Sequence, residues 1–509
     1  MEALFLTRTR YLNGLICPKM LWLRVNRREA FGDAAISVQS VENSKNVQML
    51  ARQLFDPVKV IEHGEYAVME EVTKKAFSEL RSLYTEGSLL PALAHAAVSF
   101  QNCHCLVDLV ALRPDGGAEL YMVKAASHIS AAVREDLSYQ YYVLRMAGFP
   151  VKKAAVLYVN RDYELQEEIE PGKLFREMEL TGEMKKRMPA VRDTIAKLRI
   201  YMTQEREPGR RLSEGCFSPY DCSCFGFCGK DLPSPNVFQL AGTKLEDKIR
   251  FYDQGRVGFE ELSGSPGLSA TAALQIRCEL EKGPLQADRD AIREFLRSLW
   301  EPLYFLDFEA FQPVVPKYPG TKPFDTIVFQ YSVHGEEENE LLHREFLGNP
   351  ASDPRRELAE NLVRDIPGNA CILAFNASYE KKRIAELAVR FPELEEPLMR
   401  LHAHIVDLMP LFQKKQVYDR RMQGSYSLKA VLPALFPEDS SLDYRNLSGV
   451  NSGGEAADAF QELLRLEGGK KEALRAEMLR YCELDTYAMV KIVEKLRELL
   501  REEDEGEKR

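Results

Sequence analysis

Acidic side chains in three segments of the C-terminal part have the types and spacing that metal-dependent chemistry requires. Asp307 and Glu309 stand in LYFLDFEAF, where alternation places both carboxylates on one face, at the point where the apolar strand ends. Tyr481 and Asp485 stand four residues apart in RYCELDTYAMV and so share one face of a predicted helix. Glu380 follows the buried strand CILAF. Sites in α/β sheets lie beyond the carboxyl ends of the strands, so we expect these segments to meet at one edge.

A cluster of carboxylates implies a bound cation, because the like charges otherwise repel one another. Hard oxygen ligands select magnesium or manganese. Two such ions, roughly 3.5 to 4 Å apart, activate a water and stabilise the leaving oxygen of an in-line phosphoryl displacement. Each acid alone is more often a solvated strand cap, and the hypothesis rests on their joint order and spacing. The pattern predicts a metal-dependent phosphodiester hydrolase.

The elements that must position these acids alternate between strands and helices. Strands are predicted at 303–311, 325–334 and 371–375, and a helix begins near Tyr379. A long amphipathic helix is predicted over 475–503. This order indicates an α/β sheet over about 299–509.

The same residues resemble the motifs of the DEDD, or DnaQ-like, superfamily of 3'-5' exonucleases: D-x-E, an H-N-x-x-F-D-like stretch, and Y-x3-D. Asp307 and Glu309 match the first motif, and Tyr481 and Asp485 match the third. The resemblance implies a ribonuclease H-like mixed-sheet domain with two Mg²⁺ or Mn²⁺ ions, held by the four acids, and a phenol at 481 that positions the attacking water.

The second motif of that superfamily is altered in this chain. FNASYE has Phe375 where the family has histidine, and Glu380 where it has aspartate. Glutamate is one methylene longer and still binds a metal. Asp407, in HIVDLMPLF, resembles an aspartate that is usually structural in the family and is the reserve candidate for the fourth ligand.

Four of the ten cysteines fall within thirteen residues, in SEGCFSPYDCSCFGFCGKDLP. Cys216, Cys222 and Cys228 are spaced at two intervals of six, with Cys224 as an extra. Disulfides are not expected in a reducing cytosol, so the cluster predicts a metal loop. Structural zinc sites favour C-x2-4-C pairs, and wider spacing suits an iron-sulfur cluster better. Small buried side chains in a turn remain the alternative without metal.

The 509 residues are enough for about three domains. The first, 1–232, has predicted strands at 103–112, 118–126 and 153–160 and a helix at 134–148. A polar stretch rich in proline and glycine, 233–298, is predicted to be a helical connector to the domain at 299–509.

The first domain resembles RecB-like PD-(D/E)xK nucleases, especially the CRISPR-associated subset that carries a [4Fe-4S] cluster. In that subset one early and three late cysteines bind the cluster, and Cys17, Cys216, Cys222 and Cys228 stand at those places. The resemblance implies a restriction-endonuclease-like fold whose two ends are joined by the cluster. Such a link closes a loop of about 200 residues, so its loss should loosen the whole domain. Cys224 could replace either neighbour.

The nuclease motif of this first domain is degenerate. Asp108 and Lys124 match the pattern, but Met122 occupies the glutamate position, and a thioether is a poor ligand for magnesium. Glu119 is an odd number of residues from Lys124 and faces the other side of the strand. Gln140 resembles the glutamine that contacts nucleic acid in this group. We expect a domain that binds nucleic acid and cuts it poorly or not at all.

Net charge limits how nucleic acid can be bound. Lys and Arg number 68 against 78 Asp and Glu, which gives −10, so a contact surface must be local. Basic clusters that could hold phosphates occur at 210–211, 381–383, 414–415 and 420–421, although a solvated helix face explains each equally well. The substrate expected from the resemblance is single-stranded DNA, with RNA possible.

Composition and hydropathy exclude several protein classes. With 45% hydrophobic and 29% charged residues the chain is neither collagenous nor disordered. No apolar run approaches the roughly 18 residues of a membrane span, and Arg8 and Arg10 interrupt the stretch where a secretory signal needs its apolar core. A cytoplasmic protein without membrane contact is expected.

The order of segments resembles a bacterial fusion family that joins a RecB-like iron-sulfur domain to a ribonuclease H-like exonuclease, which implies a role in DNA repair or defence. The leading hypothesis is a metal-dependent exonuclease whose iron-sulfur domain binds or guides the strand. A second hypothesis is a non-catalytic nucleic-acid-binding or redox-sensing module with vestigial nuclease sites. A zinc-stabilised scaffold is the third.

Overall fold

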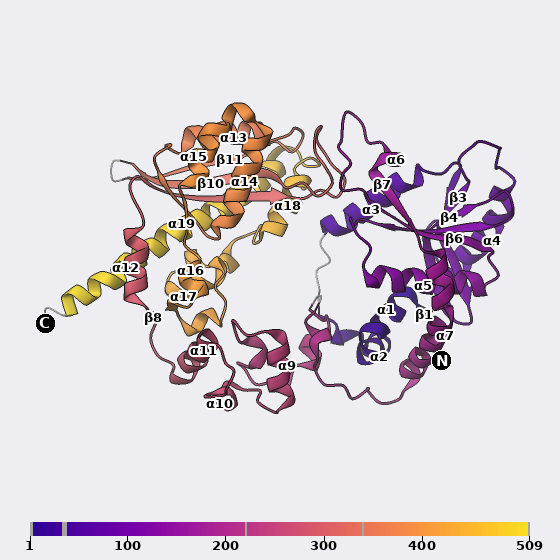
Figure 1. Ribbon diagram of the computed structural model, residues 1–509, viewed down its shortest axis with the longest axis horizontal. Helices are drawn as coiled ribbons and strands as arrows, with labels where there is room; N and C mark the ends of the chain where they lie inside the picture. The colour runs from indigo at the N-terminus through magenta and orange to yellow at the C-terminus, as the bar shows by residue number, and fades with distance from the viewer. Residues whose placement is uncertain (1–3, 33–37, 219–220, 338–339, 507–509) are drawn as a thin grey trace. The chain divides into compact units, whose positions relative to one another are not determined.

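The computed structural model describes residues 4–32, 38–218, 221–337 and 340–506 (Figure 1). The chain divides into two compact units. The first comprises Met1–Asp231 and Pro313–Asp325, and the second comprises Leu232–Gln312 and Thr326–Arg509. The stretch 233–298 thus groups with the second unit, and a short segment from within 299–509 groups with the first. No helix of the described residues is long and apolar enough to cross a membrane.

The first unit is built on a mixed sheet of seven strands in the order β2-β3-β4-β5-β6-β7, with β1 paired to β4. The β3–β4, β4–β5 and β6–β7 pairs are antiparallel, and the β5–β6 pair is parallel. The strands are β1 (Leu6–Thr7), β2 (Val58–Val60), β3 (Ala92–Phe100), β4 (Cys103–Leu112), β5 (Ala118–Lys124), β6 (Val151–Val159) and β7 (Phe175–Glu179). The strand β3 was not among the elements predicted from the sequence.

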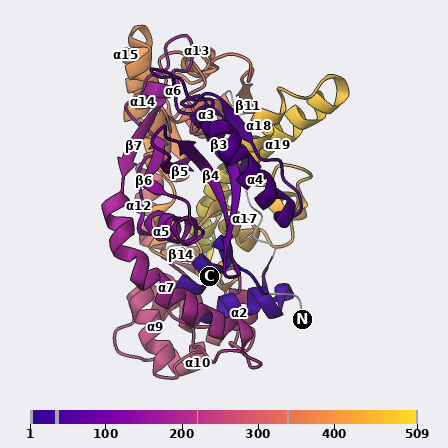
Figure 2. The ribbon, with the colours of Figure 1, turned by 90° about the vertical axis from the view of Figure 1, so that its right-hand side faces the viewer.

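Helices cover both faces of this sheet and create two apolar cores. The helices are α1 (Arg8–Ile16), α2 (Pro18–Asn26), α3 (Val38–Arg52), α4 (Tyr66–Arg81), α5 (Ala131–Met146), α6 (Pro171–Leu174), α7 (Thr181–Thr203) and α8 (Phe225–Cys228). One core joins the sheet to α4, α5 and α7, and the other joins it to α3 and the segment 313–325. Figure 2 shows α4 beside β3 and β4.

The second unit contains a mixed sheet of five strands in the order β11-β10-β9-β12-β13. The β9–β10 and β10–β11 pairs are antiparallel, and the β9–β12 and β12–β13 pairs are parallel. Its strands are β9 (Leu303–Phe311), β10 (Ile327–Glu337), β11 (Glu340–Leu347), β12 (Cys371–Ala374) and β13 (Ile405–Asp407), and a separate pair joins β8 (Gln286–Ala287) to β14 (Val417–Tyr418). The whole chain is therefore a mixed α/β protein.

The remaining helices belong to this unit: α9 (Leu245–Asp253), α10 (Phe259–Leu262), α11 (Ala270–Glu281), α12 (Arg289–Arg297), α13 (Arg355–Asp365), α14 (Ala377–Arg390), α15 (Glu395–Ala403), α16 (Pro410–Gln413), α17 (Leu428–Leu435), α18 (Gly453–Glu462) and α19 (Gly468–Gly506). The 3-10 turns of the chain are η1 (Arg28–Ala30), η2 (Glu214–Cys216), η3 (Val237–Gln239), η4 (Pro392–Leu394), η5 (Arg420–Met422), η6 (Ser440–Leu442) and η7 (Tyr444–Asn446).

The pleat of β9 sorts its side chains between two layers. Tyr304, Leu306 and Phe308 pack into the core formed with α13, α14 and α15. The alternate residues face α19, which contacts β9 and β10 on the other side of the sheet (Figure 1). Because α19 covers this second face, acidic residues at alternate positions of β9 are directed at a helix instead of at solvent.

Candidate functional site

Three carboxylates from β9 and α19 form the tightest acidic group of the second unit. One oxygen from each of Asp307, Glu309 and Asp485 lies within 4.8 Å of the other two. Glu309 and Asp485 are each 7% exposed. The strand β9 continues to Phe311, so Asp307 lies at its middle, and the expectation that the acids stand where the strand ends was wrong. The alternation that places both acids on one face is as expected.

A fourth carboxylate, Glu380, approaches the group from the first turn of α14. This helix begins directly after β12 because Asn376 takes a left-handed conformation, with φ of 77°, that turns the chain from strand to helix. Glu380 is only 2% exposed, and its Oε2 atom has no hydrogen-bond partner. Its negative charge contributes to the raised pKa of Asp307. A buried carboxylate oxygen without a donor is costly unless a cation or water satisfies it.

Asp407 has a different role from the other acids. Its Oδ1 atom accepts hydrogen bonds from the backbone N–H groups of Asn376, at 3.1 Å, and Met409, at 3.0 Å. Asp407 therefore fixes the turn from which α14 starts. Its negative charge contributes to the raised pKa of Glu380. This arrangement makes Asp407 a positioning residue for Glu380.

Two tyrosines and a lysine surround Asp485. The hydroxyl of Tyr444, in η7, donates to Asp485 Oδ1 at 2.6 Å, and the phenol of Tyr481 also hydrogen-bonds this carboxylate. The ammonium group of Lys429, in α17, lies 4.9 Å from the ring centre of Tyr481 and 5.4 Å from that of Tyr444. Its positive charge partly offsets the rise in the pKa values of Glu309 and Asp485. Lys429 and Tyr444 were not predicted as site residues from the sequence.

Burial raises the pKa values of all four acids. The pKa values of Glu309 and Glu380 rise to about 8, and that of Asp485 rises to about 6. The pKa of Asp307 lies well above its ordinary value because burial combines with the charges of Asp485, Glu309 and Glu380. Without a cation, Glu309 and Glu380 therefore hold protons near neutral pH, whereas Asp485 is mostly ionised.

A glycine at the start of α18 gives Glu309 its space. A Cβ atom at Gly453 would lie 3.2 Å from Glu309 Oε2, closer than ordinary van der Waals contact. A larger residue at this position would displace the carboxylate of Glu309. This constraint was not predicted, because it depends on the approach of a helix that is distant in the sequence.

One residue in each of three basic clusters expected to hold phosphates is engaged within the protein. Lys415 is 4% exposed and donates to the carbonyl oxygen of Gly424 at 3.2 Å. Arg383 is 3% exposed and pairs with Glu386 at 2.9 Å. Arg421 pairs with Asp419 at 2.7 Å, and its side chain is 44% exposed. Burial therefore excludes a solvated helix face for Lys415 and Arg383.

The early cysteine and the late cysteines of the first unit line one pocket. Its walls include Cys17, Cys216, Cys222, Cys224 and Cys228. Cys17 lies between α1 and α2, because Pro18 begins a new helix. A hydrogen bond from the Cys224 thiol lowers the pKa of Cys222 to about 6, which favours the thiolate form of Cys222.

The spacing of these sulfurs bears on the metal that they could bind. Tetrahedral zinc, with Zn–S bonds of about 2.3 Å, requires sulfurs roughly 3.8 Å apart. Among the described residues, groups of three ligand atoms within 4.8 Å occur at Asp307, Glu309 and Asp485 and at His334, His343 and Glu483, and the cysteines form no such group. Which metal these sulfurs would bind stays a prediction.

The degenerate nuclease residues of the first unit converge on an acid that the sequence analysis missed. Asp136, in α5, is 3% exposed. It accepts hydrogen bonds from Arg8 Nε at 2.6 Å, Gln140 Nε2 at 3.0 Å and Lys124 Nζ at 3.2 Å. Asp108 instead accepts the backbone N–H of Val123 at 2.9 Å. Two cations neutralise Asp136, so it is bound in an ion-pair network and does not present a free carboxylate.

Comparisons with known proteins cover part of this chain. Residues 304–427 match a family described as "Domain of unknown function (DUF2779)". That range includes Asp307, Glu309 and Glu380 and ends before Asp485. An uncharacterized protein of Mycoplasma genitalium is 24% identical over an alignment of 237 positions, which covers 42% of this chain and 35% of that protein. The chain is similar to these proteins over those ranges, and neither description names an activity.

Proposed function

We propose that the second unit is a divalent-metal-dependent nuclease, a 3'-5' exonuclease that hydrolyses nucleic-acid phosphodiesters. The observation that carries this proposal is the convergence of Asp307, Glu309 and Asp485, with one oxygen of each within 4.8 Å of the others. Glu380 adds a buried carboxylate with an unsatisfied oxygen. Four acids at one buried point are a ligand set for hard cations.

The donor set fits two Mg²⁺ or Mn²⁺ ions, which Asp307, Glu309, Glu380 and Asp485 would hold. Bound ions would supply an activated water and stabilise the leaving oxygen. The raised pKa values agree with this role, because a bound cation would neutralise the repulsion between the acids, and the protein supplies too little positive charge to do so. The cost of holding repelling acids together is typical of a functional site.

The other side chains of the site would position the substrate and the water. The phenol of Tyr481 hydrogen-bonds Asp485 and lies beside the ammonium group of Lys429. A groove of the second unit is lined by Lys429 and Tyr444, together with Arg421 and Arg445. Both arginines pair with neighbouring aspartates, and the Lys429 ammonium group donates to the carbonyl oxygen of Asn451. Because the charge of Lys429 acts on Glu309 and Asp485, it is the cation of this groove that we assign to a substrate phosphate.

The strand order of the second unit supports the proposed nuclease activity. A five-stranded sheet whose first three strands are antiparallel neighbours and whose last two are parallel suits a ribonuclease H-like domain of the DEDD class. The acids of such a domain come from the first strand and the last long helix, as Asp307 and Asp485 do here. In the altered second motif, Glu380 takes the place of the aspartate.

For the first unit we propose a RecB-like PD-(D/E)xK fold that binds a [4Fe-4S] cluster through Cys17, Cys216, Cys222 and Cys228. The shared pocket of early and late cysteines supports this assignment. Cys224 is 1% exposed and hydrogen-bonds Cys222, so we assign it to shaping the loop and not to ligation. The ion pairs of Asp136 favour a unit that binds or guides a strand without cutting it.

A strand-end digestion assay tests the proposed activity. Single-stranded DNA and RNA of one sequence, labelled at either the 3' or the 5' end, are incubated with the full chain and Mg²⁺ or Mn²⁺. We expect a 3' label to be released as mononucleotides and a 5' label to give a descending ladder. Asp307→Asn and Asp485→Asn should slow digestion by at least about a hundredfold.

The matched control for these variants is Asp290→Asn. It makes the same acid-to-amide change at a side chain of α12 that is 94% exposed. Digestion by this variant should equal that of the original chain. Absence of digestion with either metal, or digestion that Asp307→Asn leaves unchanged, would contradict the proposal and favour a non-catalytic binding module.

A further inference from the structure

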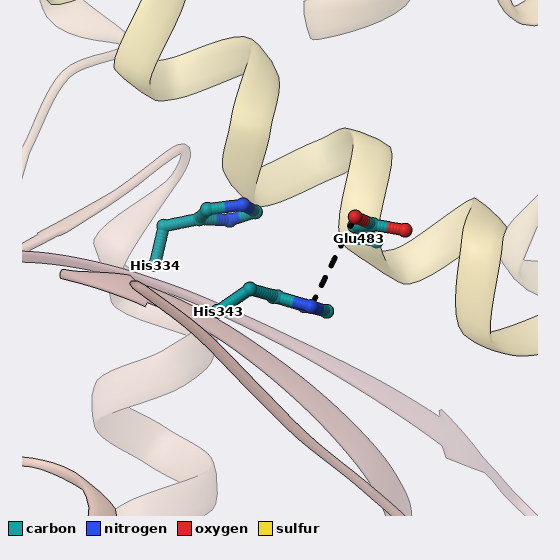
Figure 3. A group of neighbouring side chains, drawn as sticks. All are labelled: His334, His343 and Glu483. Carbon is teal, nitrogen blue, oxygen red and sulfur yellow. Dashed lines mark ion pairs between the residues drawn. The ribbon is translucent and has the colours of Figure 1, made fainter. Parts of the chain in front are cut away.

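Two histidines and a glutamate form a second group of potential metal ligands in the second unit (Figure 3). His334 lies on β10, His343 lies directly opposite it on β11, and Glu483 lies on α19. One ligand atom from each lies within 4.8 Å of the other two, and His343 Nδ1 is 3.9 Å from Glu483 Oε1. Figure 3 shows both rings pointing from the strands toward the helix. None of the three belongs to the carboxylate site.

Hydrogen bonds hold one nitrogen of each ring. His334 Nδ1 lies 2.8 Å from Thr486 Oγ1, and His343 Nε2 lies 2.9 Å from Ser332 Oγ. The two hydroxyl oxygens lie 2.7 Å apart, and Thr486 Oγ1 also lies 3.1 Å from the carbonyl oxygen of Glu483. When the Thr486 hydroxyl donates to that carbonyl, it accepts from His334 Nδ1 and from Ser332, and Ser332 then accepts from His343 Nε2.

This pattern leaves a lone pair on His334 Nε2 and another on His343 Nδ1. His334 is 3% exposed, and a neutral imidazole with a free lone pair is the form of histidine that binds metals. Ring nitrogens of metal-bound histidines typically have this arrangement, in which the other nitrogen donates to a nearby acceptor that fixes the ring. Two lone pairs and a carboxylate thus gather at one place, and a cation satisfies all three.

We propose that His334, His343 and Glu483 bind one zinc ion. Two imidazoles and one carboxylate are ligands that zinc accepts, whereas magnesium and manganese prefer oxygen alone. Zinc requires ligand atoms closer than 3.9 Å, and the Glu483 side chain, 48% exposed, is free to move that short distance. His343 is 24% exposed, so water can complete a tetrahedral coordination.

The ion would tie α19 to the β10–β11 hairpin. Glu483 stands two residues before Asp485 on the same helix, and Ser332 is paired in register with Asp307 on β9. A link at this point would hold the helix that carries one acid of the carboxylate site against the sheet that carries two others. Zinc binding does not require that the carboxylate site be a nuclease, so the two proposals can fail separately.

Zinc binding to the full chain tests this inference. Chelator-treated protein is titrated calorimetrically with Zn²⁺, and the zinc retained after dialysis is counted per chain. Glu483→Gln is compared with Glu498→Gln, which makes the same change on the same helix at a side chain that is 55% exposed. His343→Asn is compared with His402→Asn, in α15. The first variant of each pair should lose one zinc equivalent or bind it at least tenfold more weakly.

The cysteine pocket would also bind added zinc, so the signals must be separated. Cobalt in place of zinc gives an intense charge-transfer band when thiolates are ligands, and this band should be the same in all four variants. The weaker visible bands of nitrogen- and oxygen-bound cobalt should fall in Glu483→Gln and His343→Asn alone. Equal zinc counts, affinities and visible bands in each variant and its control would overturn the proposal. Because Glu483 is half-exposed, Glu483→Gln tests the site even if His343→Asn folds poorly.

Discussion

Magnesium binding at the carboxylate site should release protons, and the number follows from the pKa values of the acids. Glu309 and Glu380 have pKa values of about 8, which burial raises from 4.5. At pH 7, groups with such values are about 90% protonated. A carboxylate binds a cation only after it loses its proton, so binding competes with protonation.

The expected magnitude is at least about two protons for each chain that fills its site at pH 7. The two glutamates account for about two, Asp307 adds to this number, and Asp485, with a pKa of about 6, adds little. The protons belong to the coupled cluster and not to single residues. The apparent affinity for magnesium should therefore rise by at least about a hundredfold per pH unit near pH 6.5 and level off above the raised pKa values.

Calorimetry in two buffers with different ionisation enthalpies counts these protons directly. Magnesium is the appropriate ion because thiols and imidazoles compete poorly for it. The observed heat should depend on the ionisation enthalpy of the buffer with a slope of at least about two. Asp290→Asn should preserve the slope, and Asp307→Asn should reduce both slope and affinity. A heat that is independent of the buffer, with magnesium nevertheless bound, would refute the reasoning.

Three further predictions concern stability. The folded chain holds the proton of Glu309 while the unfolded chain releases it, so this stabilisation is complete below about pH 4.5 and is lost as pH rises toward 8. The Tm of metal-free protein should fall over that range, less steeply for Glu309→Gln, and magnesium should reverse the fall in the original chain alone. Tyr444→Phe removes the 2.6 Å hydrogen bond to Asp485 and should cost about 1–3 kcal/mol in chemical unfolding, whereas Tyr426→Phe, at an exposed side chain, should cost almost nothing. Asp136→Asn weakens pairing with two cations and should cost about 1–3 kcal/mol, so equal denaturation midpoints for this variant and the original chain would contradict the ion-pair network.

Local patterns predicted the strands and helices that carry the acids. The strand predicted over 303–311 has the bounds of β9, because an apolar run with alternating acids has the period of a strand. It also placed Tyr481 and Asp485 on one helix face. The position of Asp307 at the middle of β9 was not predicted, because α19, which covers that face, lies more than 150 residues away along the chain.

Residues that act through tertiary contacts were missed. Tyr444 and Lys429 lie on short elements, and only the folded chain brings them to Asp485. Asp136 was missed because a single acid in an amphipathic helix has no distinguishing spacing. The histidines of β10 and β11 face each other through strand register, which a sequence without an evident turn motif does not specify.

The central claim is that Asp307, Glu309, Glu380 and Asp485 bind divalent ions together. Anomalous scattering from crystals of the full chain equilibrated with Mn²⁺ tests it most directly. The account predicts two manganese peaks roughly 3.5 to 4 Å apart among these four carboxylates. Clear density for the four side chains with no manganese between them, in protein that binds the ion elsewhere, would contradict it.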